Sequence, residues 1–142
     1  MEKKDSQYCQ CLYYSANALA RIMTKVADEE FASLGITPSY AFLVMSVNSK
    51  PGIQPGVISI EMQLTPSTVT RLIEKMEHKG LLERRSYGKF TEVYMTQNGL
   101  EIIPGIKTCW MNLYKRYSGV LGKENAGQLT SMIYDAVKKL DK

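Results

Sequence analysis

The chain has 142 residues, a formal net charge of +4 and a hydrophobic content of 44%. This length suits one domain with a proper core, and the composition excludes a disordered or fibrous chain. The longest strongly apolar run, residues 40–47, is too short to span a bilayer, and residues 1–5 are not followed by an apolar stretch of signal-peptide type. We therefore expect a cytoplasmic protein.

The first third of the chain predicts two helices. A long amphipathic helix is expected from about residue 6 to residue 31, with apolar positions at Leu12, Leu19, Ile22, Met23 and Val26. Thr37 and Pro38 then start a second helix that continues to about Val47, because Thr before Pro is typical of a helix N-terminus. Residues 48–52, Asn-Ser-Lys-Pro-Gly, predict a loop.

A pair of helices separated by a tight turn follows. Residues 55–62 predict a short helix, and residues 63–65 form the turn to a second one. That second helix has Thr65 as N-cap and Pro66 at its first position, and Gly80 ends it in a left-handed conformation. Apolar residues recur on one face at Val69, Leu72, Ile73 and Met76. The opposite face carries Ser67, Thr68, Thr70, Arg71, Lys75 and His78.

Two short β-prone runs come directly after this helix. They cover residues 81–85 and 90–96, and the turn between them, residues 86–89, contains glycine. A helix-turn-helix followed by a hairpin is a winged helix-turn-helix. The sequence therefore predicts a mainly α fold with a small β-hairpin wing.

The helix before the hairpin has the features of a DNA-recognition helix. Small hydroxyl side chains at its start allow close approach to a major groove, and an arginine can bind guanine with two hydrogen bonds. Residues 65–90 contain six Lys or Arg and three Glu, so this window has a charge of +3. The candidate DNA-binding residues are Ser67, Thr68, Thr70, Arg71, Lys75, Arg84, Arg85 and Lys89. The alternative is a solvated surface helix with no nucleic-acid partner.

The C-terminal part predicts two more helices. One starts near Gln97 and either kinks at Pro104 or begins after it, and Gly119 and Gly122 interrupt it. The last covers residues 123–140. Because the amphipathic helices at both chain ends need an apolar partner, we expect a homodimer; the alternative is packing on their own core. We expect one domain, with dimerisation helices in 1–36 and 97–142 and a DNA-binding module in 37–96.

Three segments of the chain resemble the multiple antibiotic resistance (MarR) family of winged helix-turn-helix regulators. They are Leu-Thr-Pro-Ser-Thr-Val-Thr-Arg-Leu-Ile at 64–73, Lys-Gly-Leu-Leu-Glu-Arg-Arg at 79–85 and Met-Thr-Gln-Asn-Gly at 95–99. The resemblance implies a homodimeric DNA-binding regulator of transcription, usually a repressor, on a near-palindromic operator. It also implies a recognition helix in the major groove and a wing in the adjacent minor groove. The family's wing tip carries an acidic residue followed by arginine, whereas Lys89 is the only cation at the tip here.

The cysteines suggest one chemical function. A helix N-terminus favours a reactive thiolate, and Cys9 and Cys11 lie where the first helix starts. The organic hydroperoxide resistance branch of the family has a reactive cysteine in this helix with a tyrosine one turn later, a spacing that Cys9 and Tyr13 match. The register from residues 34–38 instead brings Cys11 nearer to that position, and Cys109 resembles a second, resolving cysteine. The alternative is that all three are inert small hydrophobes.

Conventional catalytic sites are poorly supported. His78 is the only histidine, so a histidine-based metal cluster or triad is not expected, nor is a cofactor. We expect a non-enzyme, and a thiol peroxidase using the same cysteines is the rival. A winged helix used for protein–protein contact is a third reading. The effector would be an organic hydroperoxide or a small aromatic ligand, held in a cleft lined from Tyr13, Tyr14, Tyr40 and Met45.

Overall fold

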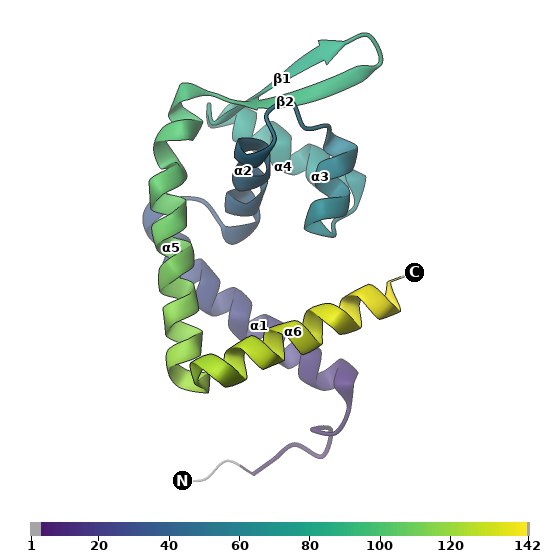
Figure 1. The fold of residues 1–142 in the computed structure, drawn as a ribbon, viewed down its shortest axis with the longest axis vertical. Helices are drawn as coiled ribbons and strands as arrows, with labels where there is room; N and C mark the ends of the chain where they lie inside the picture. The colour runs from purple at the N-terminus through teal and green to yellow at the C-terminus, as the bar shows by residue number, and fades with distance from the viewer. Residues whose placement is uncertain (1–3, 142) are drawn as a thin grey trace.

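The computed structural model describes residues 4–141 of the chain. In order, the elements are α1 (Leu12–Phe31), a 3₁₀ turn (Ala32–Leu34), α2 (Pro38–Ser49), α3 (Pro55–Met62), α4 (Pro66–His78), β1 (Leu82–Tyr87), β2 (Phe90–Met95), α5 (Gln97–Leu121) and α6 (Lys123–Leu140). Helices α2, α3 and α4 cluster under the β1–β2 hairpin, and α5 leads from the hairpin to α1 and α6 (Figure 1). The predicted mainly α fold with a hairpin wing is confirmed.

Local sequence signals set where the central helices begin. Pro38, Pro55 and Pro66 each occupy the start of a helix, where the missing N–H has no intrahelical partner to lose. The predicted N-cap of α4 is also present, because the Thr65 hydroxyl accepts a hydrogen bond from the backbone N–H of Thr68 at 3.4 Å. The α3–α4 turn includes Gln63, whose φ of 58° is left-handed. The predicted helix-turn-helix therefore has its expected boundaries.

A single apolar core joins the winged part to α5. Its fully buried members are Leu43, Val44, Val47, Ile58, Val69, Ile73, Met76, Val93 and Ile106. The predicted inner face of α4 is confirmed, with Leu72 half-buried beside the three buried positions. Helix α3 contributes Ile58 to this core and packs the half-buried Met62 against it, while Val57 and Ile60 are exposed. The outer face of α4 is thus fixed by burial of the inner face.

The junction of α4, the hairpin and α5 is held by a compact set of backbone contacts. Gly80, at φ 76°, donates its N–H to Glu77, and Leu81 donates to Met76, which is the Schellman arrangement. The Thr96 hydroxyl donates to the carbonyl of Gly80 at 2.6 Å and accepts from the N–H of Gly99 at 3.0 Å. Thr96 therefore caps α5 and ties its start to the end of α4.

The hairpin is longer than the sequence predicted. The expected turn at residues 86–89 shrinks to Gly88 and Lys89, because Tyr87 and Phe90 are paired across the two strands. Gly88 has φ 60°, which a two-residue hairpin turn of type II′ requires at its first position. Ile53 also bridges to Val93, so the loop after α2 extends the hairpin by one isolated pair.

Three ends of two predicted helices need correction. Helix α1 begins at Leu12 rather than near residue 6, because Cys9 and Cys11 donate N–H groups to Ser6 and Tyr8 in turns before it. Helix α5 starts at Gln97 and continues through Pro104. The alternative prediction, a helix that begins only after Pro104, is therefore wrong. Gly119 lies within α5, and Gly122 alone ends it, at φ 88°.

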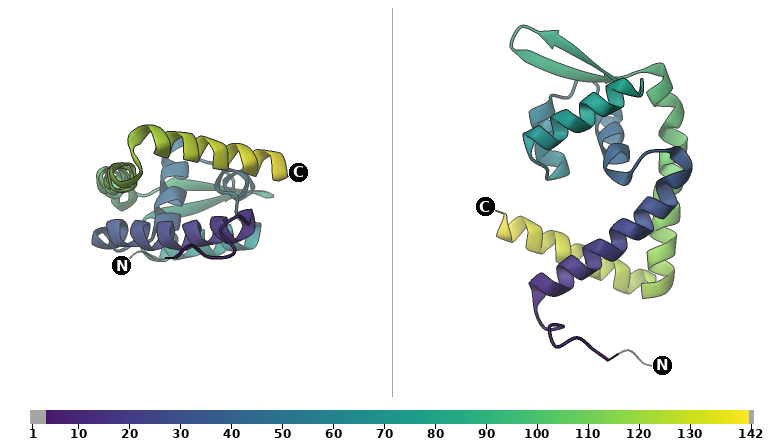
Figure 2. Two further views of the ribbon diagram at one scale, coloured as in Figure 1. Left: turned by 90° about the horizontal axis from the view of Figure 1, so that it is seen from below. Right: turned by 180° about the vertical axis from the view of Figure 1, so that it is seen from behind.

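Helices α1, α5 and α6 form an arm away from the hairpin (Figure 2). Arg116 of α5 pairs with Glu29 and Glu30 of α1, at 2.7 and 3.4 Å, so the acidic run at residues 28–30 is partly used in this packing. Helix α6 packs on the end of α5 and has one buried residue, Ala126. Among residues 4–141 no single helix is long and apolar enough to cross a membrane; α1 with its 3₁₀ turn and α2 satisfy length and composition only as a pair bent by 67°.

Candidate nucleic-acid interface

The outer face of α4 is exposed and rich in hydroxyl groups near its N-terminus. Ser67 and Thr70 are exposed and Thr68 is half-buried. The Thr65 hydroxyl lies 2.9 Å from that of Thr68 and 3.3 Å from that of Ser67, so the three form one polar cluster. The Thr70 hydroxyl donates back to the Pro66 carbonyl at 3.0 Å, which leaves its methyl group and its lone pairs outward. Such a surface suits close approach to a nucleic-acid groove.

Arg71 is the exposed cation next to this cluster. One guanidinium nitrogen lies 3.4 Å from the Thr68 hydroxyl, and no carboxylate of residues 4–141 forms an ion pair with it. A guanidinium without an internal counter-ion keeps most of its five donors available for an acceptor pair such as guanine O6 and N7. The structure therefore presents Arg71 as the sequence predicted.

Lys75 lies on the side of α4 that faces α2. Its ammonium group is 6.0 Å from the centre of the Tyr40 ring, and together with Lys79 it borders a depression beside Thr37. Lys79 also donates to the carbonyl of Gly35 at 3.5 Å. Both cations lie at the edge of the exposed face of α4, on the side of α2. Cations at this edge are better placed to contact DNA phosphates than base edges. His78 is exposed at the end of the helix.

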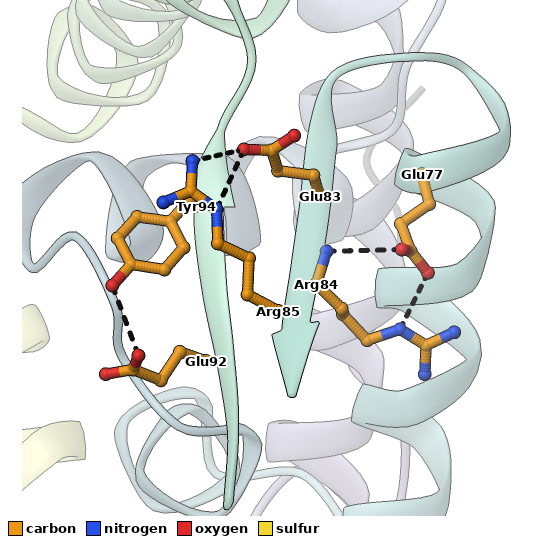
Figure 3. A network of polar contacts seen from close by, with 6 residues as sticks. All are labelled: Glu77, Glu83, Arg84, Arg85, Glu92 and Tyr94. Carbon is orange, nitrogen blue, oxygen red and sulfur yellow. Dashed lines mark hydrogen bonds and ion pairs between the residues drawn. The ribbon is translucent and has the colours of Figure 1, made fainter. Parts of the chain in front are cut away.

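Arg84 is engaged inside the chain. Its Nε lies 2.7 Å from Oε1 of Glu77, and its backbone N–H donates to Oε2 of the same carboxylate at 3.2 Å (Figure 3). One Glu77 side chain thus fastens the start of β1 to the last turn of α4. This contact fixes the angle between hairpin and helix, which is a positioning role that the sequence did not predict for Arg84.

Arg85 is likewise held, on the opposite face of the hairpin. It donates to Oε1 of Glu83 through two nitrogens, at 2.6 and 3.2 Å, and its guanidinium covers the Tyr94 ring at 4.1 Å (Figure 3). The Tyr94 hydroxyl in turn donates to Glu92 at 3.2 Å. The hydrogen bond to Glu83 raises the pKa of Arg85. The pKa of Tyr94 is also raised, first because neighbouring atoms exclude water from its side chain and second because the Glu92 carboxylate is negatively charged.

The cysteines are divided between surface and core. Cys9 and Cys11 are exposed in the segment before α1, Cys11 being its N-cap residue. Cys109 is buried in α5, with its sulfur 3.9 Å from the Ser33 hydroxyl of the same chain. Tyr13, the residue paired with Cys9 by spacing, is 80% exposed. A disulfide from either surface cysteine to Cys109 would first require α5 and the 3₁₀ turn to separate.

A cavity of about 630 Å³ opens between α2, α3 and α5. Its lining residues are Ser39, Phe42, Met45, Ser46, Ser49, Glu61, Met62, Leu64 and Trp110. Phe42 and Trp110 meet edge to face at 5.2 Å, so two aromatic rings form one wall. Of the four residues expected to line a cleft, only Met45 does so. Tyr40 borders the depression beside Lys75, while Tyr13 and Tyr14 lie exposed on α1.

The described residues hold no group of three or more His, Cys, Asp or Glu side chains placed to bind a metal ion. Two side chains at the hairpin tip, Tyr87 and Phe90, were not predicted as neighbours, because the turn is shorter than the four residues expected. A two-residue turn at Gly88 and Lys89 would have made them neighbours across the strands.

Comparison with known proteins agrees with this geometry. Residues 36–86, which contain the helix-turn-helix and most of β1, match the family model described as "MarR family". A protein of Thauera aromatica named "Putative transcriptional regulatory protein for hcr operon" is 22% identical over 106 residues, covering 70% of this chain. The matched region spans 61% of that relative's length.

Solved structures show the same fold along nearly the whole chain. The transcriptional repressor CouR bound to a 23-mer DNA duplex aligns with a TM-score of 0.87 at 17% identity, over 96% of this chain and 99% of that one. CouR bound to p-coumaroyl-CoA aligns with a TM-score of 0.85 at 18% identity, over 96% and 98%. The fold is therefore that of a winged helix-turn-helix transcriptional regulator. The predicted resemblance to the MarR family is confirmed by the match of residues 36–86 to its family model.

Proposed function

We propose that this chain binds double-stranded DNA as a homodimer and regulates transcription, acting as a repressor that a small molecule releases. The observation that carries the proposal is the outer face of α4. It presents hydroxyl groups and Arg71, which has no internal ion pair among the described residues, beside a hairpin fixed to the same helix by Glu77. A CouR structure of this fold is bound to a DNA duplex, which supports double-stranded DNA as the partner here.

The apolar surface of the arm supports a second copy as partner. Exposed large apolar side chains on α1, α5 and α6 include Leu12, Ile22, Met111, Val120, Leu129, Met132, Ile133 and Leu140. A contiguous apolar surface on a monomer marks an association site. A two-fold dimer would bury these helices and place two copies of α4 on successive half-sites of a near-palindromic operator.

The cavity between α2, α3 and α5 supports a ligand-controlled repressor. Its size lies in the range of small-molecule sites, and Phe42 and Trp110 give it an aromatic wall. Since α2 and α3 of the winged part and Trp110 of α5 all line it, a small aromatic ligand there would change how α4 is held relative to the dimer arm. CouR, which has the same fold, has been solved with p-coumaroyl-CoA bound.

Two alanine substitutions on α4 test the DNA-binding proposal. Arg71→Ala should lower the affinity for a selected duplex by about 1–3 kcal/mol and relax the sequence preference at the base it contacts. Lys75→Ala should weaken binding to all duplexes alike. It should also lower the magnitude of the slope of log binding constant against log salt concentration by about one. Fluorescence anisotropy at several salt concentrations, with a duplex selected from a randomised pool, measures both effects.

Asp135→Ala in α6 serves as a control, because that carboxylate pairs with Lys139 of its own helix and lies outside the proposed DNA face. The assignment of Arg71 would be overturned if Arg71→Ala bound the selected duplex with unchanged affinity and unchanged preference. Uniform loss for both variants, without relaxed preference, would reduce Arg71 to a phosphate contact.

A thiol-based signal is the second candidate function, favoured by the exposure of Cys9 and Cys11 at the start of α1. We expect two thiols per chain to react rapidly with a disulfide reagent under native conditions. Cys109 should react only after unfolding, because it is buried against Ser33. Thiol titration of the wild type and of Cys109→Ser checks this. If organic hydroperoxide leaves both surface thiols titratable and DNA affinity unchanged, redox control is excluded.

A further inference from the structure

The hairpin tip carries two large aromatic side chains in solvent. Tyr87 is 55% exposed and Phe90 is 60% exposed, and they are cross-strand partners on either side of the Gly88–Lys89 turn. The hairpin extends beyond the helices of the winged part, so no element of the described chain covers this end (Figures 1 and 2). Exposed apolar side chains gathered at a protruding point indicate a contact surface.

The charged side chains beside these rings are only partly paired. Side chains alternate along a strand, so Tyr87 and Phe90 share a face with Arg85 and Glu83. Arg85 is held by Glu83 and covers Tyr94, as Figure 3 shows. Lys89, between the two rings in sequence, has no ion pair among residues 4–141. Glu92, opposite Arg85 on the same face, accepts a hydrogen bond from Tyr94 and also has no ion pair among residues 4–141, so one unpaired cation and one unpaired carboxylate flank the aromatic pair.

We propose that Tyr87 and Phe90 form an aromatic wedge that enters the DNA minor groove next to the major groove occupied by α4. This inference rests on the proposed DNA-binding function. Apolar side chains that enter a minor groove can insert between base steps and kink the duplex, and the negative potential of a narrow minor groove attracts a cation such as Lys89. The wedge would replace the cationic contact that Arg84 and Arg85 cannot make while paired.

The geometry of the hairpin suits this role. A strand of six residues spans about 20 Å, whereas the major groove is about 12 Å wide, so the tip can reach past one phosphate backbone. The Glu77–Arg84 contact fixes the hairpin to α4. The wedge would therefore enter the duplex at a constant distance from the bases that α4 reads. DNA is the occupant we propose because the hairpin is fixed directly beside α4, the proposed DNA-binding helix.

Affinity measurements on tip variants test the wedge. With a duplex selected by the wild type from a randomised pool, Phe90→Ala and Tyr87→Ala should each bind about tenfold more weakly. For both variants the slope of the logarithm of the binding constant against the logarithm of the salt concentration should stay unchanged. Lys89→Ala should lower the magnitude of that slope by about one. Phe90→Leu should retain most of the affinity, because leucine also serves as a wedge. Ser86→Ala and Thr91→Ala, the next cross-strand pair on the opposite face, are the matched controls.

A fluorescent base analogue, 2-aminopurine, reports insertion directly. Placed at successive steps beside the α4 site, it should brighten at one step with the wild type and stay quenched with Phe90→Ala. If the wild type selects no duplex, the proposed function fails and the wedge with it. If the wild type binds selectively while both alanine variants match the controls, only the wedge is overturned, and the aromatic tip would then serve a protein contact.

Discussion

Replacing Gly99 by alanine is expected to lower the free energy of unfolding by about 3 kcal/mol or more. A Cβ atom at this position would overlap the carbonyl oxygen of Leu81 and lie 3.0 Å from the methyl carbon of Met95. The first neighbour is backbone at the end of α4, so relief requires the junction of α4, hairpin and α5 to move. Urea denaturation followed by circular dichroism measures the change.

Gly119→Ala, in the same helix, should have the opposite sign. An added Cβ there meets no atom within 4 Å, and alanine is favoured over glycine inside a helix by about 0.5–1 kcal/mol. If Gly99→Ala proved as stable as the wild type, the close approach of α5 to Leu81 described here would be wrong. Because the junction also orients the wing, DNA affinity should fall with stability.

A charged pair of substitutions in α6 is expected to abolish both dimerisation and DNA binding. Leu129→Glu combined with Ile133→Glu places two carboxylates on the exposed apolar face of α6, where burial against a second copy would strongly disfavour them. The mass in sedimentation should fall from two chains to one. Affinity for the selected duplex should fall about a hundredfold or more, since one winged module contacts one half-site.

Ser131→Glu, an exposed polar position of the same helix, should remain dimeric and bind normally. Deletion of residues 123–142 should reproduce the effect of the double substitution, with aggregation in place of a soluble monomer where the end of α5 is uncovered. A double variant that sediments as a well-behaved dimer would move the interface away from α6.

The sequence predicted the helix-turn-helix well because its signals are local. Thr65 followed by Pro66 starts α4, and Gly80 ends it through backbone geometry that needs no distant partner. The same holds for Gly122 between α5 and α6. The start of α1 was misplaced because residues 6–11 continue the polar–apolar pattern, while their hydrogen bonds form separate turns.

The roles of Arg84 and Arg85 could not be predicted, because a positive charge in sequence does not reveal its partner. Glu77 reaches Arg84 only after the chain reverses at Gly80, and Arg85 is held partly by Tyr94 from the second strand. Cys109 has the same problem, since its burial depends on packing against Ser33, far away in sequence. The exposed position of Arg71 could be predicted because Arg71 lies within one helix, where periodicity determines the face.

Two copies of α4 are expected to read two half-sites of one duplex. Hydroxyl-radical footprinting of the wild type on a duplex selected from a randomised pool tests it most directly. We expect the wild type to protect two regions of related sequence that lie one helical turn, or a multiple of it, apart. Both regions should lose protection with Leu129→Glu/Ile133→Glu, and both should be protected more weakly with Arg71→Ala. A single protected region that Arg71→Ala leaves intact, or no sequence preference at all, would contradict it.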